Sequence, residues 1–144
     1  MRIANCFLST LLFFLCATLS AAEKQQDTRE LVSMPEEIQH EILANMRDHL
    51  NILNQILIHL ANDEMDEAAE LAEYKLGMSS MGKGHGGERR KYMPEGMRSF
   101  GQNLHRSASR FSRKAEEGDL EQAIKSLSEM TSVCTACHAS YRIR

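Results

Sequence analysis

Cysteine is scarce in this chain, and its distribution argues against a disulfide framework. The 144 residues include four cysteines, and two of them, Cys6 and Cys16, lie in an apolar N-terminal segment with the features of a removable leader. Loss of that segment leaves only Cys134 and Cys137, three positions apart. Because both belong to one short motif, we expect no structural disulfide in the mature chain.

An excess of positive charge is also missing. The chain carries 17 basic and 20 acidic residues, a formal net charge of −3. Loss of residues 1–22 removes Arg2 and no acidic residue, so the formal net charge falls by one, to −4. This mild acidity argues against a nucleic-acid partner. The content of 42% hydrophobic and 26% charged residues is ordinary for one globular domain.

Residues 1–22 have the pattern of a secretory signal peptide. A basic start at Arg2 precedes an apolar run over residues 3–19, and the small residues 20–22 provide a cleavage site. The alternative is a retained membrane anchor, but the apolar run is shorter than the ~20 residues that a spanning helix needs. We therefore predict cleavage after Ala22, export, and no stable membrane span in the mature chain.

The mature chain divides into a polar segment and one helical domain. Residues 23–34 lack periodicity and are predicted to be a flexible leader, and residues 35–144 are predicted to be the domain. Ser33 and Glu36 have the spacing of a capping box, with Pro35 in the first turn of the first helix. The expected apolar seam of that helix consists of Leu43, Met46, Leu50, Leu53, Leu57 and Leu60.

Three further segments show the same spacing of three and four, and none shows the alternation of a strand. Residues 78–93, which contain several glycines, are predicted to form a long crossover loop between the second and third helices. Two helix pairs with short turns and one longer connection predict an all-α, antiparallel four-helix bundle. The expected helix boundaries are marked by Asn62-Asp63, Gly77, Pro94, Gly118 and Asp119.

The sequence Cys134-Thr135-Ala136-Cys137-His138 carries the most specific chemistry of the chain. On a helix, its two thiols and its imidazole stand at positions i, i+3 and i+4 and project from one face. This pattern is typical of covalent haem attachment, with Cys134 and Cys137 as thioether sites and His138 as the proximal iron ligand. The apolar face of the fourth helix leads directly into it, through Leu120, Ala123, Ile124, Leu127 and Met130.

Other functions of a Cys-x-x-Cys pair remain as alternatives. A structural zinc site would need four nitrogen or sulfur ligands, and the chain has no second cysteine pair to supply them. A redox dithiol belongs at the start of a helix that follows a strand, and no such pattern precedes the motif. Haem attachment is therefore the favoured interpretation.

With its motif near the end of the last helix, the chain resembles the class II c-type cytochromes, the cytochrome c′ family. Residues 134–142, including Tyr141-Arg142 after the histidine, resemble the C-terminal signature of that family. The resemblance implies a four-helix bundle with one covalently attached haem c per chain, often a homodimer through its first two helices. It also implies a periplasmic location, because c-type haem is attached outside the bacterial inner membrane.

The resemblance also implies roles for three further residues. Arg142 would be a basic residue on the proximal side of the iron, and the alternative is a solvated cation that favours the helix dipole. Leu43 would occupy the distal position. In one departure from the family, Gln39 stands where an arginine that contacts a haem propionate is common.

The function depends on the sixth coordination position of the iron. Met46, one turn from Leu43, is a candidate ligand, although methionine in a bundle seam more often packs. Methionine ligation would favour electron transfer, whereas a five-coordinate iron beside Leu43 would bind nitric oxide or carbon monoxide. We predict a carrier of single electrons between redox partner proteins, with gas binding as the alternative. An enzyme is the weakest hypothesis, because no acid, base or nucleophile accompanies the haem motif.

The crossover residues suggest one more metal interpretation. Thioether and imidazole groups suit Cu(I), and the chain offers Met78, Met81, Met93 and Met97 together with His85. The favoured interpretation is that these methionines cover the haem edge and the end of the bundle. His85 is also a weak candidate for the sixth ligand, since its glycine neighbours give it no fixed position.

Overall fold

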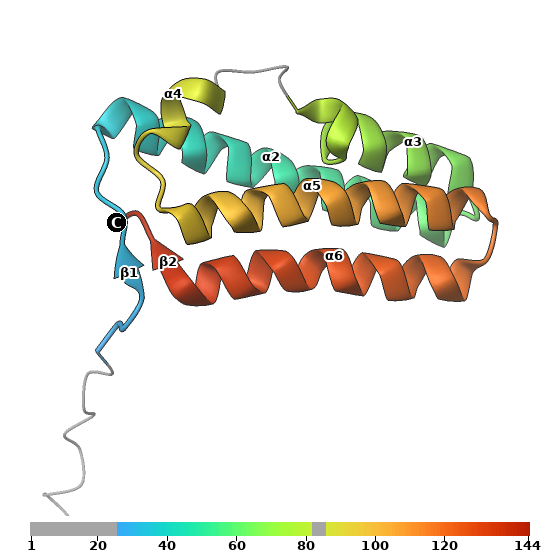
Figure 1. Cartoon of the computed structure of the whole chain (residues 1–144). Helices are drawn as coiled ribbons and strands as arrows, with labels where there is room; N and C mark the ends of the chain where they lie inside the picture. Colours follow the sequence, from blue (N-terminus) through green and yellow to red (C-terminus); the bar gives the residue numbers. More distant parts are fainter. Residues whose placement is uncertain (1–25, 82–85) are drawn as a thin grey trace, which may run out of the picture.

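The all-α prediction is confirmed by the computed structural model, which describes residues 26–81 and 86–144. Helices make up most of these residues, and each of the two strands has only two residues. Four long helices lie alongside one another in Figure 1. They are α2 (Glu36–Ala61), α3 (Met65–Lys75), α5 (Glu95–Glu116) and α6 (Leu120–Ser140).

The long helices pack in chain order. Helix α3 lies against α2 and α5, and α5 lies against α6. In the described part of the chain, α2 and α6 make no comparably close backbone approach. Residues 62–64 and 117–119 form short turns at the same end of the molecule, which we name the turn end (Figure 1). The opposite end, where α2 begins and α6 finishes, is the motif end.

The predicted boundary between the last two long helices is confirmed. Asp119 is the N-cap of α6, and its carboxylate accepts a hydrogen bond from the backbone N–H of Gln122 at 3.1 Å. Gly118 has a φ of +74°, in the left-handed region that glycine adopts at lowest cost. The two residues therefore end α5 and start α6 through local chemistry alone.

The predicted capping box at the start of α2 is wrong. The helix begins at Glu36 with Pro35 as its N-cap residue, and no side chain caps it. Before the helix the chain is extended, so that Val32 and Met34 are buried while Ser33 between them is exposed. The burial of its two neighbours turns Ser33 away from the helix that it was expected to cap.

The turn between α2 and α3 also differs in detail from the prediction. Asn62-Asp63 interrupt the helix as expected, but Glu64 occupies the N-cap position of α3 and makes no side-chain cap. Its carboxylate instead lies 2.7 Å from Nδ1 of His59. Asp63 makes the turn by adopting a φ of 62°.

The predicted crossover loop over residues 78–93 contains two ordered pieces. These are a 3₁₀ helix, η2 (Met78–Ser80), and a short helix, α4 (Gly86–Arg90). The backbone N–H of Met78 donates to Oγ of Ser109 at 2.9 Å, which ties η2 to α5. His85, which the copper interpretation includes, lies outside the described residues.

The main apolar core lies toward the turn end. Its largest fully buried side chains include Phe111, Ile56, Leu76 and Met130. Helix α3 approaches its neighbours closely because the residues at its buried face are small, as at Ala68, Ala69 and Ala72. Dense packing around these residues makes the turn end the stable part of the fold.

The apolar seam predicted for α2 is partly wrong. Leu60 is buried, but Leu50 and Leu57 are 69% and 54% exposed. The buried face is formed instead by Ile38, Ile42, Ile56 and Leu60. This helix carries isoleucine and leucine sets at similar spacing, and packing against the other helices selects the isoleucine face.

The end of the predicted flexible leader is ordered. Strand β1 (Glu30–Leu31) pairs in parallel with β2 (Tyr141–Arg142), and the N–H of Val32 donates to the carbonyl of Arg142 at 2.8 Å. Val32 and Met34 belong to a second apolar cluster at the motif end. The second cluster consists of Val32, Met34, Ile38 and Ile42, with Met46, Met93, Met97, Tyr141 and Ile143 packed against it.

Among residues 26–81 and 86–144, no helix is both long enough and apolar enough to cross a bilayer. Residues 1–22, where a signal peptide is predicted, lie outside the described part of the chain.

Candidate functional site

The Cys-x-x-Cys-His motif lies in the last turns of α6, as the sequence predicts. Helix α6 continues to Ser140, so Cys134, Cys137 and His138 are all helical. Both thiols are free and half-buried, and His138 is exposed. Their spacing therefore brings two thiols and an imidazole to one side of a regular helix.

The surroundings of the two thiols do not favour their ionised forms. Burial raises the pKa of the Cys134 thiol, and burial together with the charge of Cys134 raises the pKa of Cys137. A reactive redox dithiol has the opposite setting, at a helix N-terminus that lowers the pKa of its thiol. The position of this pair at the end of a 21-residue helix thus weakens the redox alternative.

The described residues contain no cluster of side chains suited to hold a metal ion. Within residues 26–81 and 86–144, no three or more His, Cys, Asp or Glu side chains are placed to hold one metal ion. The four protein ligands of a structural zinc site are therefore not assembled from the described residues. Of the methionines in the copper hypothesis, Met93 and Met97 pack against the second cluster, whereas Met78 and Met81 are exposed.

The two distal candidates lie on α2. Leu43 and Met46 are both half-buried. Met46 packs against the second cluster, which also receives Tyr141 from the residues directly after the motif. Met46 of α2 and Tyr141, which follows the motif, therefore pack against the same apolar cluster.

Several apolar side chains at the motif end are only half-buried. They come from α2, α5 and α6, and they are Leu43, Met46, Met97, Phe100 and Val133. Phe100 makes an edge contact with Tyr141, with ring centroids 6.3 Å apart. The backbones of α2 and α6 do not approach each other closely near these side chains. Half-buried apolar side chains in such a place suit the insertion of a flat apolar group.

Gly96 at the start of α5 lies against the side chain of Tyr141. A Cβ atom at this position would collide with the Tyr141 hydroxyl group. Glycine therefore lets the ring after the motif approach the backbone of α5.

The side chain of Arg142 lies beside a carboxylate from the N-terminal part of the chain. Its side chain is half-buried, and its Nε lies 3.5 Å from Oδ2 of Asp27. Asp27 also accepts hydrogen bonds from Arg29, from Nε at 2.9 Å and from Nη2 at 2.7 Å. These bonds from Arg29 lower the pKa of Asp27 from 3.8 to about 2. No sequence pattern pointed to Asp27, because its partner Arg142 is at the other end of the chain.

Arg89 in α4 is a second unexpected basic residue. Its Nε and that of Arg142 are the buried side-chain nitrogen or oxygen atoms that lack a hydrogen-bond partner among the described residues. Arg142 has the Asp27 carboxylate nearby, but Arg89 has no ion pair in that part of the chain. A buried guanidinium nitrogen without an acceptor is costly, so Arg89 is suited to an anionic group.

His49 of α2 and His105 of α5 are both half-buried. Burial lowers the pKa of His49, and the charges of His105 and Arg89 lower it further, against the opposing effect of Asp48. Nδ1 of His105 lies 2.8 Å from the carbonyl oxygen of Leu76, so this nitrogen carries the proton that it donates. His105 therefore connects α5 to the end of α3.

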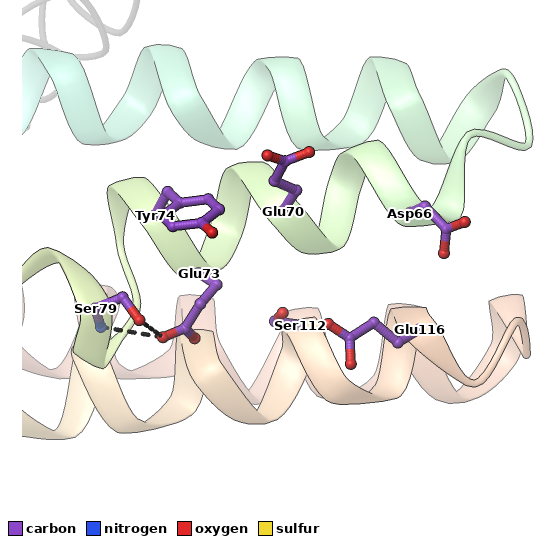
Figure 2. Close-up of a pocket in the computed structure, with 7 residues that line it drawn as sticks. All are labelled: Asp66, Glu70, Glu73, Tyr74, Ser79, Ser112 and Glu116. Atoms are coloured by element: carbon purple, nitrogen blue, oxygen red, sulfur yellow. Dashed lines mark hydrogen bonds between the residues drawn. The ribbon is translucent and has the colours of Figure 1, made fainter.

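A hollow of about 390 Å³ lies elsewhere, between α3 and α5. Figure 2 shows its lining of mostly acidic side chains, in which Glu73 accepts bonds from the backbone N–H and the hydroxyl of Ser79. Burial raises the pKa of Glu73, but hydrogen bonds from Ser109 and Ser79 outweigh this effect and lower it. The lining consists of Asp66, Glu70, Glu73, Tyr74, Ser79, Ser112 and Glu116.

None of the residues of the Cys-x-x-Cys-His motif lines this hollow. The contacts of Glu73 hold η2 in place, and this is the role that we assign to it.

Comparison of the chain with known protein families, with curated proteins and with solved structures finds no match. The functional assignment therefore depends on the residues and their geometry.

Proposed function

We propose that the chain is a c-type haem protein that resembles class II cytochromes, with its four long helices forming an antiparallel bundle. Cys134 and Cys137 hold one haem c through thioethers, and His138 is the proximal ligand. The observation that carries the proposal is the helical Cys-x-x-Cys-His motif at the end of α6, with two free, half-buried thiols. The raised pKa values of the two thiols favour this role over that of a redox dithiol.

The residues at the motif end fit the chemistry of this group. Its apolar ring suits the half-buried side chains of α2, α5 and α6, such as Met97 and Phe100. Its carboxylates suit Arg89, whose buried Nε lacks an acceptor. Gln39 carries no charge to balance a carboxylate, and one N–H of its amide already donates to the carbonyl of Met34 at 3.1 Å. Arg89 would thus act in place of the arginine that the family commonly carries at the position of Gln39.

The proposed activity is the transfer of single electrons between periplasmic partner proteins, without catalysis. When bound, the haem supplies a one-electron couple, and the chain supplies a low-polarity setting and a fixed histidine. The described residues around the motif include no activated thiol. Electron transfer needs only the one-electron couple of the haem, its low-polarity setting and the histidine ligand.

A second function is favoured by the packing of Met46. This side chain already packs against the second cluster. If it stays there, the distal side next to Leu43 is apolar and lacks a ligand. A five-coordinate iron in such a pocket binds nitric oxide or carbon monoxide.

The first test is expression of the full chain in a bacterium that attaches c-type haem in its periplasm. The proposal predicts haem that remains on the chain in a denaturing gel and a mass increase of one haem. A periplasmic protein without covalent haem would refute the proposal.

The second test separates the two functions through absorption spectra of the ferric and ferrous protein. Low-spin iron that becomes high-spin in Met46→Leu supports methionine ligation and electron transfer. High-spin iron in the unchanged protein, with carbon monoxide binding in the ferrous state, supports gas binding. Met93→Leu is the matched control, because Met93 packs against the same cluster from outside α2.

The resemblance also suggests a homodimer through the first two helices. Leu50, Leu57 and Ile58 of α2 are at least half exposed, and a partner could cover them. Sedimentation of the unchanged protein and of Leu57→Glu tests this part separately. A monomer in both cases would contradict the dimer and leave the haem proposal intact.

A further inference from the structure

The segment just before α2 is attached to the residues that follow the haem motif. In β1 and β2, Glu30 is paired with Tyr141 and Leu31 with Arg142. The next residue, Val32, donates its N–H to the carbonyl of Arg142 at 2.8 Å and buries its side chain in the second cluster. Residues that are far apart in the sequence are therefore held side by side, as Figure 1 shows for β1 and β2.

Polar contacts extend this attachment toward His138. Asp27 holds Arg29 through two short bonds and lies 3.5 Å from Nε of Arg142. Nη1 of Arg29 reaches the carbonyl oxygen of His138 at 3.5 Å, a long and weak contact. Residues 27–32 thus contact the helix end at the proposed iron ligand and at the two residues of β2. We name residues 27–32 the strap.

The end of a helix needs such support. The last four carbonyl groups of α6 lack partners within the helix, and terminal turns fray when nothing holds them. His138 lies in that last turn, and its side chain is exposed. An imidazole on a fraying turn would hold iron poorly, because ligation needs a fixed orientation of the ring.

We propose that the strap is a positioning element that keeps His138 and Arg142 in place on the proximal side of the haem. This inference rests on the proposed haem function and assigns Asp27 and Arg29 as positioning residues. The backbone pairing of β1 with β2 holds the chain after the helix. The carboxylate of Asp27 lies beside the Arg142 guanidinium, 3.5 Å from its Nε, and partly offsets the electrostatic effect of its positive charge.

The test uses the haem-loaded full chain with Asp27→Ala and Arg29→Ala. Glu30→Ala is the matched control, because Glu30 is an exposed carboxylate of the same segment and none of the side-chain hydrogen bonds or ion pairs of the strap involves it. Thermal unfolding is followed by far-UV circular dichroism and by the visible bands of the haem. Since thioethers keep the haem on the chain, the bands report ligation by His138 and not release of the haem.

In the unchanged protein and in the control we expect the two transitions to coincide. In both strap variants we expect the band transition to shift to a lower temperature than the loss of helix, so that the two curves separate. Asp27→Ala should also raise the reduction potential, because the Arg142 cation is no longer balanced. The expected change in the oxidised-to-reduced ratio is roughly two- to fivefold.

Coincident transitions in both strap variants, with an unchanged potential, would overturn the positioning role. Residues 27–32 would then only stabilise the fold. Absence of covalent haem from the unchanged protein would instead refute the proposed function, and the strap inference with it. The haem content of the purified protein therefore distinguishes the two failures.

Discussion

The two ends of the molecule are packed differently. At the turn end, Phe111, Ile56 and Met130 are each 0% exposed, and the helices close on their own side chains. At the motif end, apolar residues such as Met97 and Phe100 stay half-buried, although they too belong to regular helices. The turn end is closed by its own side chains, whereas the half-buried side chains at the motif end, which lie beside the buried cluster of Val32 and Ile42, are the ones that we propose the haem covers.

The largest effect is expected from removal of both thiols. Cys134→Ala combined with Cys137→Ala should abolish covalent haem attachment, because the other two cysteines, Cys6 and Cys16, lie in the predicted signal peptide. The motif end should then lose its cooperative unfolding while the turn end keeps helical structure. Haem staining of a denaturing gel and circular dichroism measure the two effects.

Thr135→Ala provides the control, because Thr135 is exposed between the two cysteines and its hydroxyl donates only to the carbonyl of Ser132. Retention of covalent haem in the double variant would contradict the assignment.

A second prediction compares two phenylalanines of α5. Phe111→Ala should lower the free energy of unfolding by about 3–5 kcal/mol with or without haem, because it leaves a cavity in a closed core. Phe100→Ala should cost less in the haem-free chain and more in the haem-loaded one. Urea unfolding measures both.

If Phe100→Ala lowered the free energy of unfolding equally in the haem-free and the haem-loaded protein, the proposed difference between the turn end and the motif end would be wrong. Leu57→Ala, at a side chain that is 54% exposed, should change stability by less than about 0.5 kcal/mol.

A third, smaller effect concerns Arg89. Arg89→Leu removes a cation that we assign to a haem carboxylate, so ferric haem becomes relatively more stable and the reduction potential falls. A shift of up to about 59 mV, a tenfold change in the one-electron equilibrium, is expected in a redox titration. Arg90→Leu is the matched control, since Arg90 is exposed in the same short helix. Equal potentials in the two variants would remove Arg89 from the site.

The smallest effect is the pH dependence of the strap. The folded-state pKa of Asp27 is lowered from 3.8 to about 2, so its contribution to stability is present above pH 3.8 and is lost as the pH falls toward 2. Titration of the Asp27 carboxyl carbon by NMR should give a midpoint near 2. The difference in melting temperature between the unchanged protein and Asp27→Asn should shrink over the same range. A midpoint near 3.8 would show that the contacts with Arg29 do not persist in solution.

Local signals explain which parts of the fold were predictable. Gly118 and Asp119 act through their own backbone and side-chain chemistry, so their roles could be predicted from two adjacent residues. The buried face of α2 could not, because two apolar sets with similar spacing compete and only the neighbouring helices decide between them. Leu57 was therefore expected inside and lies outside, whereas Ile42 is buried.

The site divides in the same way. The spacing of Cys134, Cys137 and His138 was sufficient to predict their common helix face, because helical geometry relates positions three and four apart. Asp27 and Arg89 showed no such local pattern. Their importance depends on a contact across the whole chain in one case and on burial without a partner in the other.

The sequence by itself determined the helical class, the end of α5, the start of α6, and the chemistry of the Cys-x-x-Cys-His motif, since each depends on residues within a few positions of one another. Only the tertiary structure decided which face of α2 is buried, that residues 27–32 join the end of α6, and that the Nε atom of Arg89 is buried. These features arise from packing between distant segments, and no local spacing encodes them.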